Sequence, residues 1–202
     1  MISEAEKARI AQAIAASEEK SAGEIFCVIA HASSGYRLVP VAWSALIALV
    51  VPLPLIYFTS LPAGLIYLAQ LLAFIVAGVI LSLPPIRFRI VPRRAMRERA
   101  HVEAMRQFLA QGLHLTERRT GVLIFLSVAE RYAEIVADAG INAKVAPAVW
   151  KDAVAVAVEA IKDGRIGDGL VAAVDRCGAV LAEHFPPGAI NRDEVPNKVV
   201  EM

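Results

Sequence analysis

Residues Leu38–Ile86 form one uncharged stretch, LVPVAWSALIALVVPLPLIYFTSLPAGLIYLAQLLAFIVAGVILSLPPI, which contains no Asp, Glu, Lys, Arg or His. The stretch is far longer than the ~20 apolar residues that one membrane helix needs. Thr59-Ser60-Leu61-Pro62 interrupts it near its middle. The pattern therefore predicts two transmembrane helices, at Leu38–Phe58 and Leu61–Leu83, joined by a tight turn. The alternative is a buried hairpin of a soluble protein, but a chain of this size has little protein to cover so long an uncharged run.

The second predicted membrane helix carries small side chains at every fourth position. Small faces let membrane helices approach closely, because packing rather than the hydrophobic effect joins helices in lipid. We therefore expect the hairpin to pack through Ala69, Gln70, Ala73 and Ala77. For Gln70 we expect a hydrogen bond to the partner helix or to another copy of the chain. A transport site would bring ionisable residues as well.

Arginines flank the apolar stretch, whereas the turn within it is uncharged. They are Arg37 before the stretch and Arg87, Arg89, Arg93, Arg94, Arg97 and Arg99 after it. Because positive residues close to a span stay cytoplasmic, the sequence predicts a two-pass protein of the inner (plasma) membrane with both termini in the cytoplasm. The same arginines are predicted to contact anionic lipid headgroups. RNA binding is the alternative for this basic segment, but beside a membrane helix the lipid surface is favoured, and no nucleic-acid partner is predicted.

The flanks of the hairpin predict one α/β domain. Residues Met1–Lys20 are charged and helical in pattern, and they lack the apolar core of a signal peptide. Ile25–Ala30 and Thr120–Val128 are short, β-branched runs typical of strands buried on both faces. Tyr132–Ala137 follows closely enough to form a β-hairpin with the second run. The predicted fold class is α/β: a small sheet flanked by helices and interrupted in sequence by an inserted two-helix transmembrane hairpin.

The predicted organisation has four segments. Residues 1–37 hold the first part of the α/β domain, 38–83 the hairpin, 84–188 a basic juxtamembrane helix with the remainder of the domain, and 189–202 a flexible tail. Without the hairpin roughly 150 residues remain, enough for one compact domain. The formal net charge of +1 hides an asymmetry, because basic residues crowd beside the hairpin and acidic ones lie further along.

Few residues suggest chemistry. Cys27 and Cys177 are the only cysteines, lack partners at metal-ligand spacing and are expected to be reduced and partly buried. The segment Gly164–Gly169 matches neither GxGxxG nor a P-loop, and it is predicted to join two helices. Asp138 follows a predicted strand, where ligand crevices open in α/β folds, and it is the candidate for catalysis or metal binding. Other catalytic residues stay unknown, and the residues predict no cofactor.

The soluble segments resemble the TPM domain, which is found in thylakoid lumen phosphatase-like proteins and in a photosystem repair factor. The resemblance lies in Gly23–Val28, Thr120–Ser127, Arg131–Ile141, Trp150 and Gly164–Leu170. Bacterial members with a membrane hairpin inserted after the first strand are the most similar. Some members are described as acid phosphatases and some bind calcium, so the resemblance implies a divalent cation such as calcium as a cofactor to be considered. After the first strand, where the family has an acidic or polar residue, this chain has His31-Ala32-Ser33-Ser34.

Three functions compete. The favoured one is a membrane-anchored TPM-like module that binds or assists a membrane protein or complex, or that associates with itself through the hairpin. The second is a weak membrane-associated acid phosphatase. The third, an oligomeric pore or transporter, is the least favoured, because two helices with one Gln offer no ion path. Binding is favoured over catalysis because no acid, base and nucleophile converge in the sequence.

Overall fold

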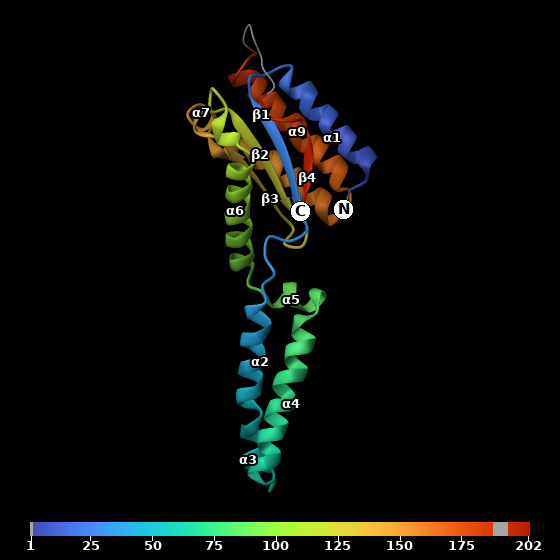
Figure 1. Ribbon diagram of the computed structural model, residues 1–202, viewed down its shortest axis with the longest axis vertical. Helices are drawn as coiled ribbons and strands as arrows, with labels where there is room; N and C mark the ends of the chain where they lie inside the picture. The colour runs from blue at the N-terminus through green and yellow to red at the C-terminus, as the bar shows by residue number, and fades with distance from the viewer. Residues whose placement is uncertain (1, 188–193) are drawn as a thin grey trace. The chain divides into compact units, whose positions relative to one another are not determined.

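The computed structural model describes residues 2–187 and 194–202, apart from the side chain of Ile161, and it divides into two compact units. One unit is continuous in sequence, Ser34–Met96. The other is an α/β unit made of two segments, Met1–Ser33 and Arg97–Met202 (Figure 1). The chain therefore leaves the α/β unit after its first strand, forms the second unit and returns.

The α/β unit contains both helices and strands. In chain order its elements are α1 (Glu4–Glu18), β1 (Glu24–Ala30), α6 (Arg93–Ala110), the 3₁₀ turn η1 (Leu113–Leu115), β2 (Gly121–Ser127), β3 (Tyr132–Ala137), α7 (Ala139–Asn142), the 3₁₀ turn η2 (Pro147–Trp150), α8 (Lys151–Lys162), α9 (Ile166–His184) and β4 (Val199–Glu201). The second unit consists of α2 (Leu38–Val50), α3 (Pro52–Phe58), α4 (Ala63–Ser82) and α5 (Pro84–Ile90), and the first residues of α6 belong to it as well.

The strands of the described residues form one mixed sheet in the order β3-β2-β1-β4. β1 and β2 pair in parallel along their whole length, from Glu24 with Gly121 to Ala30 with Ser127. β3 runs antiparallel to β2, and β4 pairs in parallel with β1. The predicted α/β fold class, the common sheet of the first two strands and the β2–β3 hairpin are confirmed.

Both faces of β1 and β2 are buried, so successive side chains enter two different cores. The first core lies under α1, α8 and α9 and takes alternate residues of both strands: Ile25, Cys27, Ile29, Val122, Ile124 and Leu126. The second lies under α6 and takes the residues between them: Phe26, Val28, Ala30, Leu123 and Phe125. Helices on both faces explain why these strands are continuously apolar rather than alternating.

The glycine-rich segment before α9 has a packing role. Gly164 ends the preceding helix with φ +71°, a conformation that favours glycine. A Cβ on Gly169 would overlap the Cβ of Ala160 in α8, and one on Gly178 would lie 2.5 Å from Ser17 Oγ in α1. These glycines let α9 lie close to both neighbouring helices, so the segment joins two helices as predicted.

The second unit is a helical hairpin in which α2 and α4 run side by side (Figure 1). On α2 the buried residues are Pro40, Ser44 and Ala48. On α4 the less exposed positions are Ile66, Ala69, Gln70, Ala73, Ala77, Gly78 and Leu81. A Cβ on Gly78 would lie 3.8 Å from Ser44 Oγ, within ordinary contact. The four residues predicted to pack the hairpin therefore lie on one face of α4.

Prolines divide the first helix of this hairpin. α2 ends at Val50 and α3 begins at Pro52, while Val51 keeps helical angles and donates its N–H to the carbonyl of Ile47 at 3.1 Å. Pro52 has no N–H to continue the helical hydrogen bonds. Together the two pieces span 21 residues with a mean hydropathy of 2.2, and α4 spans 20 residues with 2.4. Both are long and apolar enough to cross a membrane.

The basic segment after α4 is divided between two helices, so the prediction of one juxtamembrane helix is wrong. α5 ends at Ile90, Val91 is extended with ψ 127°, and α6 begins at Arg93. Pro92 is the physical reason, because a proline ring disfavours the helical conformation of the preceding residue.

The predicted flexible tail at 189–202 is wrong for its described part, 194–202, and residues 189–193 lie outside the described residues. Val195 is buried, and β4 pairs with β1 from Cys27 with Val199 to Ile29 with Glu201. The Glu201 carboxylate accepts the backbone N–H of Ile2 at 2.8 Å, which lowers the pKa of Glu201. The polar composition hid this strand, because three residues added to an existing sheet edge leave little periodic pattern.

A substitution at Ile124, in the middle of β2, tests whether this strand lies in the core. Ile124 is 1% exposed, and Asp at this position would bury a charge among apolar side chains. We expect Ile124→Asp to lower the free energy of unfolding by about 3 kcal/mol or more, or to prevent folding. Urea unfolding followed by circular dichroism measures it, with Leu115→Asp, at a 73% exposed position, as the matched control. An Ile124→Asp variant as stable as the parent would contradict the core assignment.

Candidate functional site, a groove along β3

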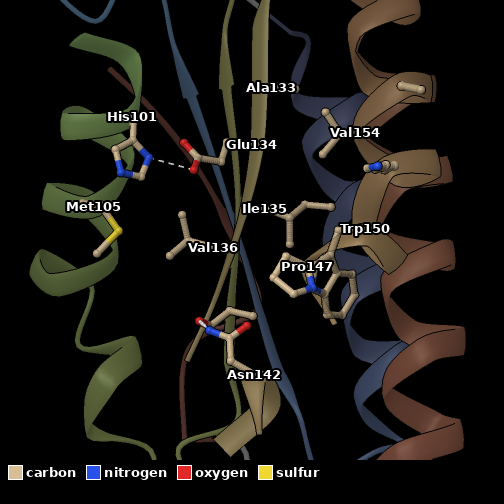
Figure 2. A pocket seen from close by; sticks show the side chains of 13 residues that line it. His101, Met105, Ala133, Glu134, Ile135, Val136, Asn142, Pro147, Trp150 and Val154 are labelled. Atoms are coloured by element: carbon tan, nitrogen blue, oxygen red, sulfur yellow. Dashed lines mark hydrogen bonds and ion pairs between the residues drawn. The ribbon is translucent and has the colours of Figure 1, made fainter. Parts of the chain in front are cut away.

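β3 is an outer strand of the sheet, and a groove of about 610 Å³ runs along it. α6 borders the groove on one face of the sheet, and η2 and α8 border it on the other (Figure 2). The lining residues are His101, Met105, Ala133, Glu134, Ile135, Val136, Ala137, Asn142, Pro147, Trp150, Lys151, Val154 and Ala155. The whole groove therefore belongs to the α/β unit.

The backbone of β3 turns alternate polar groups away from the sheet. Along an antiparallel strand, successive residues direct their N–H and C=O groups towards the partner strand and then away from it. Asp138 donates its N–H inward to the Gly121 carbonyl at 3.0 Å, so the Ala137 carbonyl points outward, where the Asn142 side chain donates to it at 2.7 Å. By the same alternation, the backbone groups of Ala133 and Ile135 face the groove. The floor of the groove is thus an open strand edge.

The α6 side of the groove carries a polar pair beside the apolar Met105 and Val136. His101 Nδ1 is 2.8 Å from Glu134 Oε1 (Figure 2). The Tyr132 hydroxyl, which does not line the groove, donates to Glu134 Oε2 at 2.9 Å. Burial raises the pKa of the Tyr132 phenol, and its hydrogen bond to Glu134 raises it further, so the phenol stays protonated as a donor. Two side chains therefore hold the Glu134 carboxylate in one orientation at the edge of the groove.

The opposite wall is apolar. Ile135, Pro147, Trp150 and Val154 lie together on the α8 side of β3 (Figure 2). Trp150 is 4% exposed, and its indole Nε1 has no hydrogen-bond partner among the described residues. An unpartnered buried donor carries a desolvation cost of about 1–3 kcal/mol. The two walls thus offer different chemistry to the two sides of whatever lies between them.

Asp138, the sequence candidate for catalysis or metal binding, caps the short helix α7. Its Oδ1 accepts the N–H of Ala139 at the start of α7, at 2.7 Å, and its Oδ2 lies 3.0 Å from Arg119 Nε. The side chain is 6% exposed and does not line the groove, although it directly follows β3. Oδ1 is therefore engaged by the helix cap, and Oδ2 by an ion pair without a hydrogen bond among the described residues.

Calcium, which the family resemblance implies, does not fit at Asp138. Ca²⁺ takes six to eight oxygen ligands, mostly from several carboxylates and carbonyls. Here one carboxylate oxygen caps a helix and the other faces a guanidinium, which repels a cation. Within residues 2–187 and 194–202, no three His, Cys, Asp or Glu side chains are placed so that they could hold a metal ion.

Sequence reasoning missed a polar cluster at the carboxyl ends of the parallel strands. Glu130 accepts the backbone N–H of Ser33 at 2.9 Å and also hydrogen-bonds the hydroxyl of Ser127, which ends β2. The Ser33 hydroxyl is buried without a partner in the described part of the chain. Glu130 thereby ties the β2–β3 turn to the exit of β1. The only sequence signal was an acidic residue in the four-residue turn between β2 and β3, which is ordinary in a solvated loop.

The structure does not gather the predicted membrane-surface arginines into one pocket. Six of them, Arg37, Arg89, Arg93, Arg94, Arg97 and Arg99, are exposed. Arg87 is half-buried, with its guanidinium 5.2 Å from the centroid of the Phe88 ring. Cys27 and Cys177 are free and completely buried, which raises the pKa of both thiols, that of Cys177 to about 12. Neither thiol is therefore a reactive nucleophile.

The comparison with protein families gives a match to the TPM domain over residues 85–180. This protein contains a TPM domain. The matched range runs from α5 to α9 and includes β2, β3 and every residue that lines the groove. β1 and β4 lie outside it, although both belong to the same sheet. The recognition made from the sequence is therefore confirmed.

One solved structure with a similar fold is the NMR structure of the BA42 protein from the psychrophilic bacterium Bizionia argentinensis. The two share 20% sequence identity with a TM-score of 0.62, over 100% of this chain and 96% of that one. At this identity the likeness shows the fold alone. No curated protein matches the chain.

The role of Asp138 as a cap is open to a direct test. Ala at this position removes both the cap and the ion pair, so we expect Asp138→Ala to cost about 1–2 kcal/mol of stability. Asn still caps a helix and loses only the pair with the half-exposed Arg119, so Asp138→Asn should cost less than about 1 kcal/mol. Urea unfolding measures both, with Asp168→Asn, in an exposed pair with Arg9, as the control.

The Asp138→Asn variant also tests whether Asp138 is a catalytic residue. A folded Asp138→Asn protein that has lost hydrolysis of a generic phosphomonoester, where the parent shows it, would make Asp138 a catalytic residue. Equal activity in both proteins supports the structural role.

Proposed function

We propose that this TPM module is anchored in a membrane by the α2–α4 hairpin and binds or assists a membrane protein or complex there. The observation that carries this proposal is the exposure of the hairpin. No residue of α4 is buried, although the helix is almost entirely apolar. Leaving such surface in water costs roughly 25 cal/mol for each Å² of apolar area. Lipid removes that cost along the whole length of both helices.

The distribution of arginines supports one orientation of the anchor. Basic residues precede the first span and follow the second, and the turn at Thr59–Pro62 between the spans has no charge. Under the positive-inside rule both flanks, and with them the α/β unit, lie in the cytoplasm, and the turn lies on the other side. In a bacterium this membrane is the inner membrane.

Partner binding is proposed rather than catalysis because the groove along β3 has the features of a docking surface. It combines an open strand edge, an apolar wall and an oriented carboxylate, while Asp138 is engaged as a cap. Self-association through the lipid-facing sides of α2 and α4 is the alternative for the partner. The acid phosphatase alternative stays a prediction, for which the Asp138→Asn assay is the test.

The orientation can be tested by cysteine labelling, because both native thiols are buried. We expect a Cys at Ser60, in the turn, to react with a membrane-impermeant maleimide only from the non-cytoplasmic side of sealed membrane vesicles. A Cys at the exposed Gln12 of α1 should react only from the cytoplasmic side and serves as the matched control. Labelling of both positions from one side would contradict the two-pass arrangement, and the reverse pattern would invert the topology.

Contact between the arginines and anionic headgroups should slow hydrogen exchange in the basic segment. Each basic residue near an anionic surface contributes about 1 kcal/mol, which is about five-fold in population. In vesicles with anionic lipid, amides of residues 84–96 should therefore exchange hydrogen about five-fold more slowly, or more, than in neutral vesicles, and salt should remove the difference.

Arg89→Gln together with Arg93→Gln should reduce this protection. Arg118→Gln with Arg176→Gln, at exposed positions of the α/β unit, serves as the matched control. If hydrogen exchange is the same in anionic and neutral vesicles, the arginines set the topology but do not bind the headgroups.

A further inference from the structure

We propose that the groove along β3 binds an extended peptide segment of a protein partner, which pairs with β3 and lengthens the sheet by one strand. The inference rests on the proposed partner-binding function and states how the partner is held. Strand addition to an open sheet edge supplies affinity through main-chain hydrogen bonds and specificity through pockets for alternate side chains.

The open backbone of β3 is the first argument. The N–H and C=O groups of Ala133 and Ile135 face the groove, as the outward carbonyl of Ala137 shows. Exposed strand edges are usually blunted by prolines, charges or a covering element, because they pair readily with other chains. Among the described residues, a side chain caps this edge at one end only, where Asn142 donates a hydrogen bond to the Ala137 carbonyl at 2.7 Å. The remaining edge is matched by the alternating donors and acceptors of an extended chain.

The walls of the groove select a single strand over a second copy of this protein. His101 and Met105 of α6 line one side, and Lys151 and Val154 of α8 line the other, so β3 lies recessed between two helices. A second copy would bring its own α6 and α8 against the helices that border this groove, which disfavours the ~4.8 Å approach of paired strands. An extended peptide is thin enough to enter.

The two walls also define the side chains of the occupant. Successive side chains of an added strand point to opposite faces of the sheet. Every second one would meet the apolar wall of Ile135, Pro147, Trp150 and Val154 (Figure 2). Those between would pass the His101 imidazole and the Glu134 carboxylate. Alternating apolar and hydroxyl-bearing residues fit this arrangement.

Charge complementarity places an acidic residue beside α8. Lys151 lines the groove, is exposed, and makes no ion pair within the described chain. Glu134, in contrast, is already engaged by His101 and Tyr132. The unpaired charge of the groove is therefore positive, and the segment that fits carries an Asp or Glu flanking its apolar side.

NMR of the full ¹⁵N-labelled chain in lipid nanodiscs tests the proposal. The probes are two blocked hexapeptides of alternating Val and Thr, with Asp at the first or at the last position. We expect the amide signals of Ala133 and Ile135 and the indole N–H of Trp150 to shift with one saturating curve. The indole of Trp43, in α2, is the internal control and should not shift.

The backbone pairing is tested on the peptide, so the fold of the protein is not at risk. N-methylation of the alternate amides that face β3 removes about two hydrogen bonds and should raise Kd about ten-fold or more. N-methylation of the amides between them should leave Kd nearly unchanged. Equal binding of both methylated peptides would overturn strand addition, and so would the absence of shifts at β3 up to millimolar peptide.

The charge is tested on the protein. Lys151→Glu should weaken binding of the Asp peptides several-fold and strengthen binding of the same peptides with Lys in place of Asp. Lys20→Glu, at an exposed position outside the groove, is the matched control. These titrations do not depend on the orientation of the hairpin. Absence of peptide binding would therefore leave the cysteine-labelling result unaffected, and a labelling result that contradicts the membrane anchor would leave peptide binding to the groove testable.

Discussion

The parallel pairing of β1 and β2 is the interaction on which the rest of the α/β unit depends. All seven residues of each strand are buried, and their side chains supply both cores. Two parallel strands cannot be joined by a tight turn, so a crossover must pass over a face of the sheet. In this chain that crossover contains the entire helical hairpin before α6 returns over the second core. A sequence excursion of this size leaves the register of β1 with β2 intact, because loop-closure entropy grows only slowly with loop length.

The same sheet explains why one edge is closed and the other open. β4 covers the β1 side, and its Glu201 holds the N–H of Ile2, so both ends of the described chain are tied together there. At the other side β3 pairs only with β2 within the described residues, and α6 and α8 stand on either face without covering its edge. The groove is therefore a consequence of strand order and helix placement rather than of a dedicated loop. Its walls differ because α6 contributes an imidazole and a thioether, whereas η2 and α8 contribute an indole, a proline ring, a valine and a lysine.

Family membership says less about chemistry than the individual contacts do. The TPM domain match covers α5 to α9, yet the Asp138 carboxylate within it is shared between a helix cap and Arg119. The Asp138 carboxylate stabilises the start of α7 and neutralises the charge of Arg119, and both interactions compete with binding a metal ion. The polar cluster of Ser127, Glu130 and Ser33 likewise joins the β2–β3 turn to the end of β1. The peptide binding proposed at β3 needs neither of these groups.

The sequence by itself determined the features that depend on local pattern. Uncharged length predicted the helical hairpin, β-branched runs predicted β1, β2 and β3, and the motifs around them predicted the TPM domain. These signals are strong because each residue meets the same environment, lipid-like or buried, along a whole element. The end of α5 also follows from a local rule, because Pro92 disfavours the helical conformation of Val91. The sequence prediction of one continuous helix overlooked this rule.

Only the tertiary structure decided which residues meet across the chain. β4 is three residues long and takes its stability from an edge that already exists, so residues 199–201 show no signal of their own. His101 and Glu134, or Ile135 and Trp150, come together because α6 and η2 lie on opposite faces of one strand, which no spacing in the sequence encodes. Asp138 shows the converse, since its position at a strand exit was visible in sequence but its engagement by Arg119 was not. Contacts between distant segments depend on how whole faces pack, and that is why the groove appeared only with the fold.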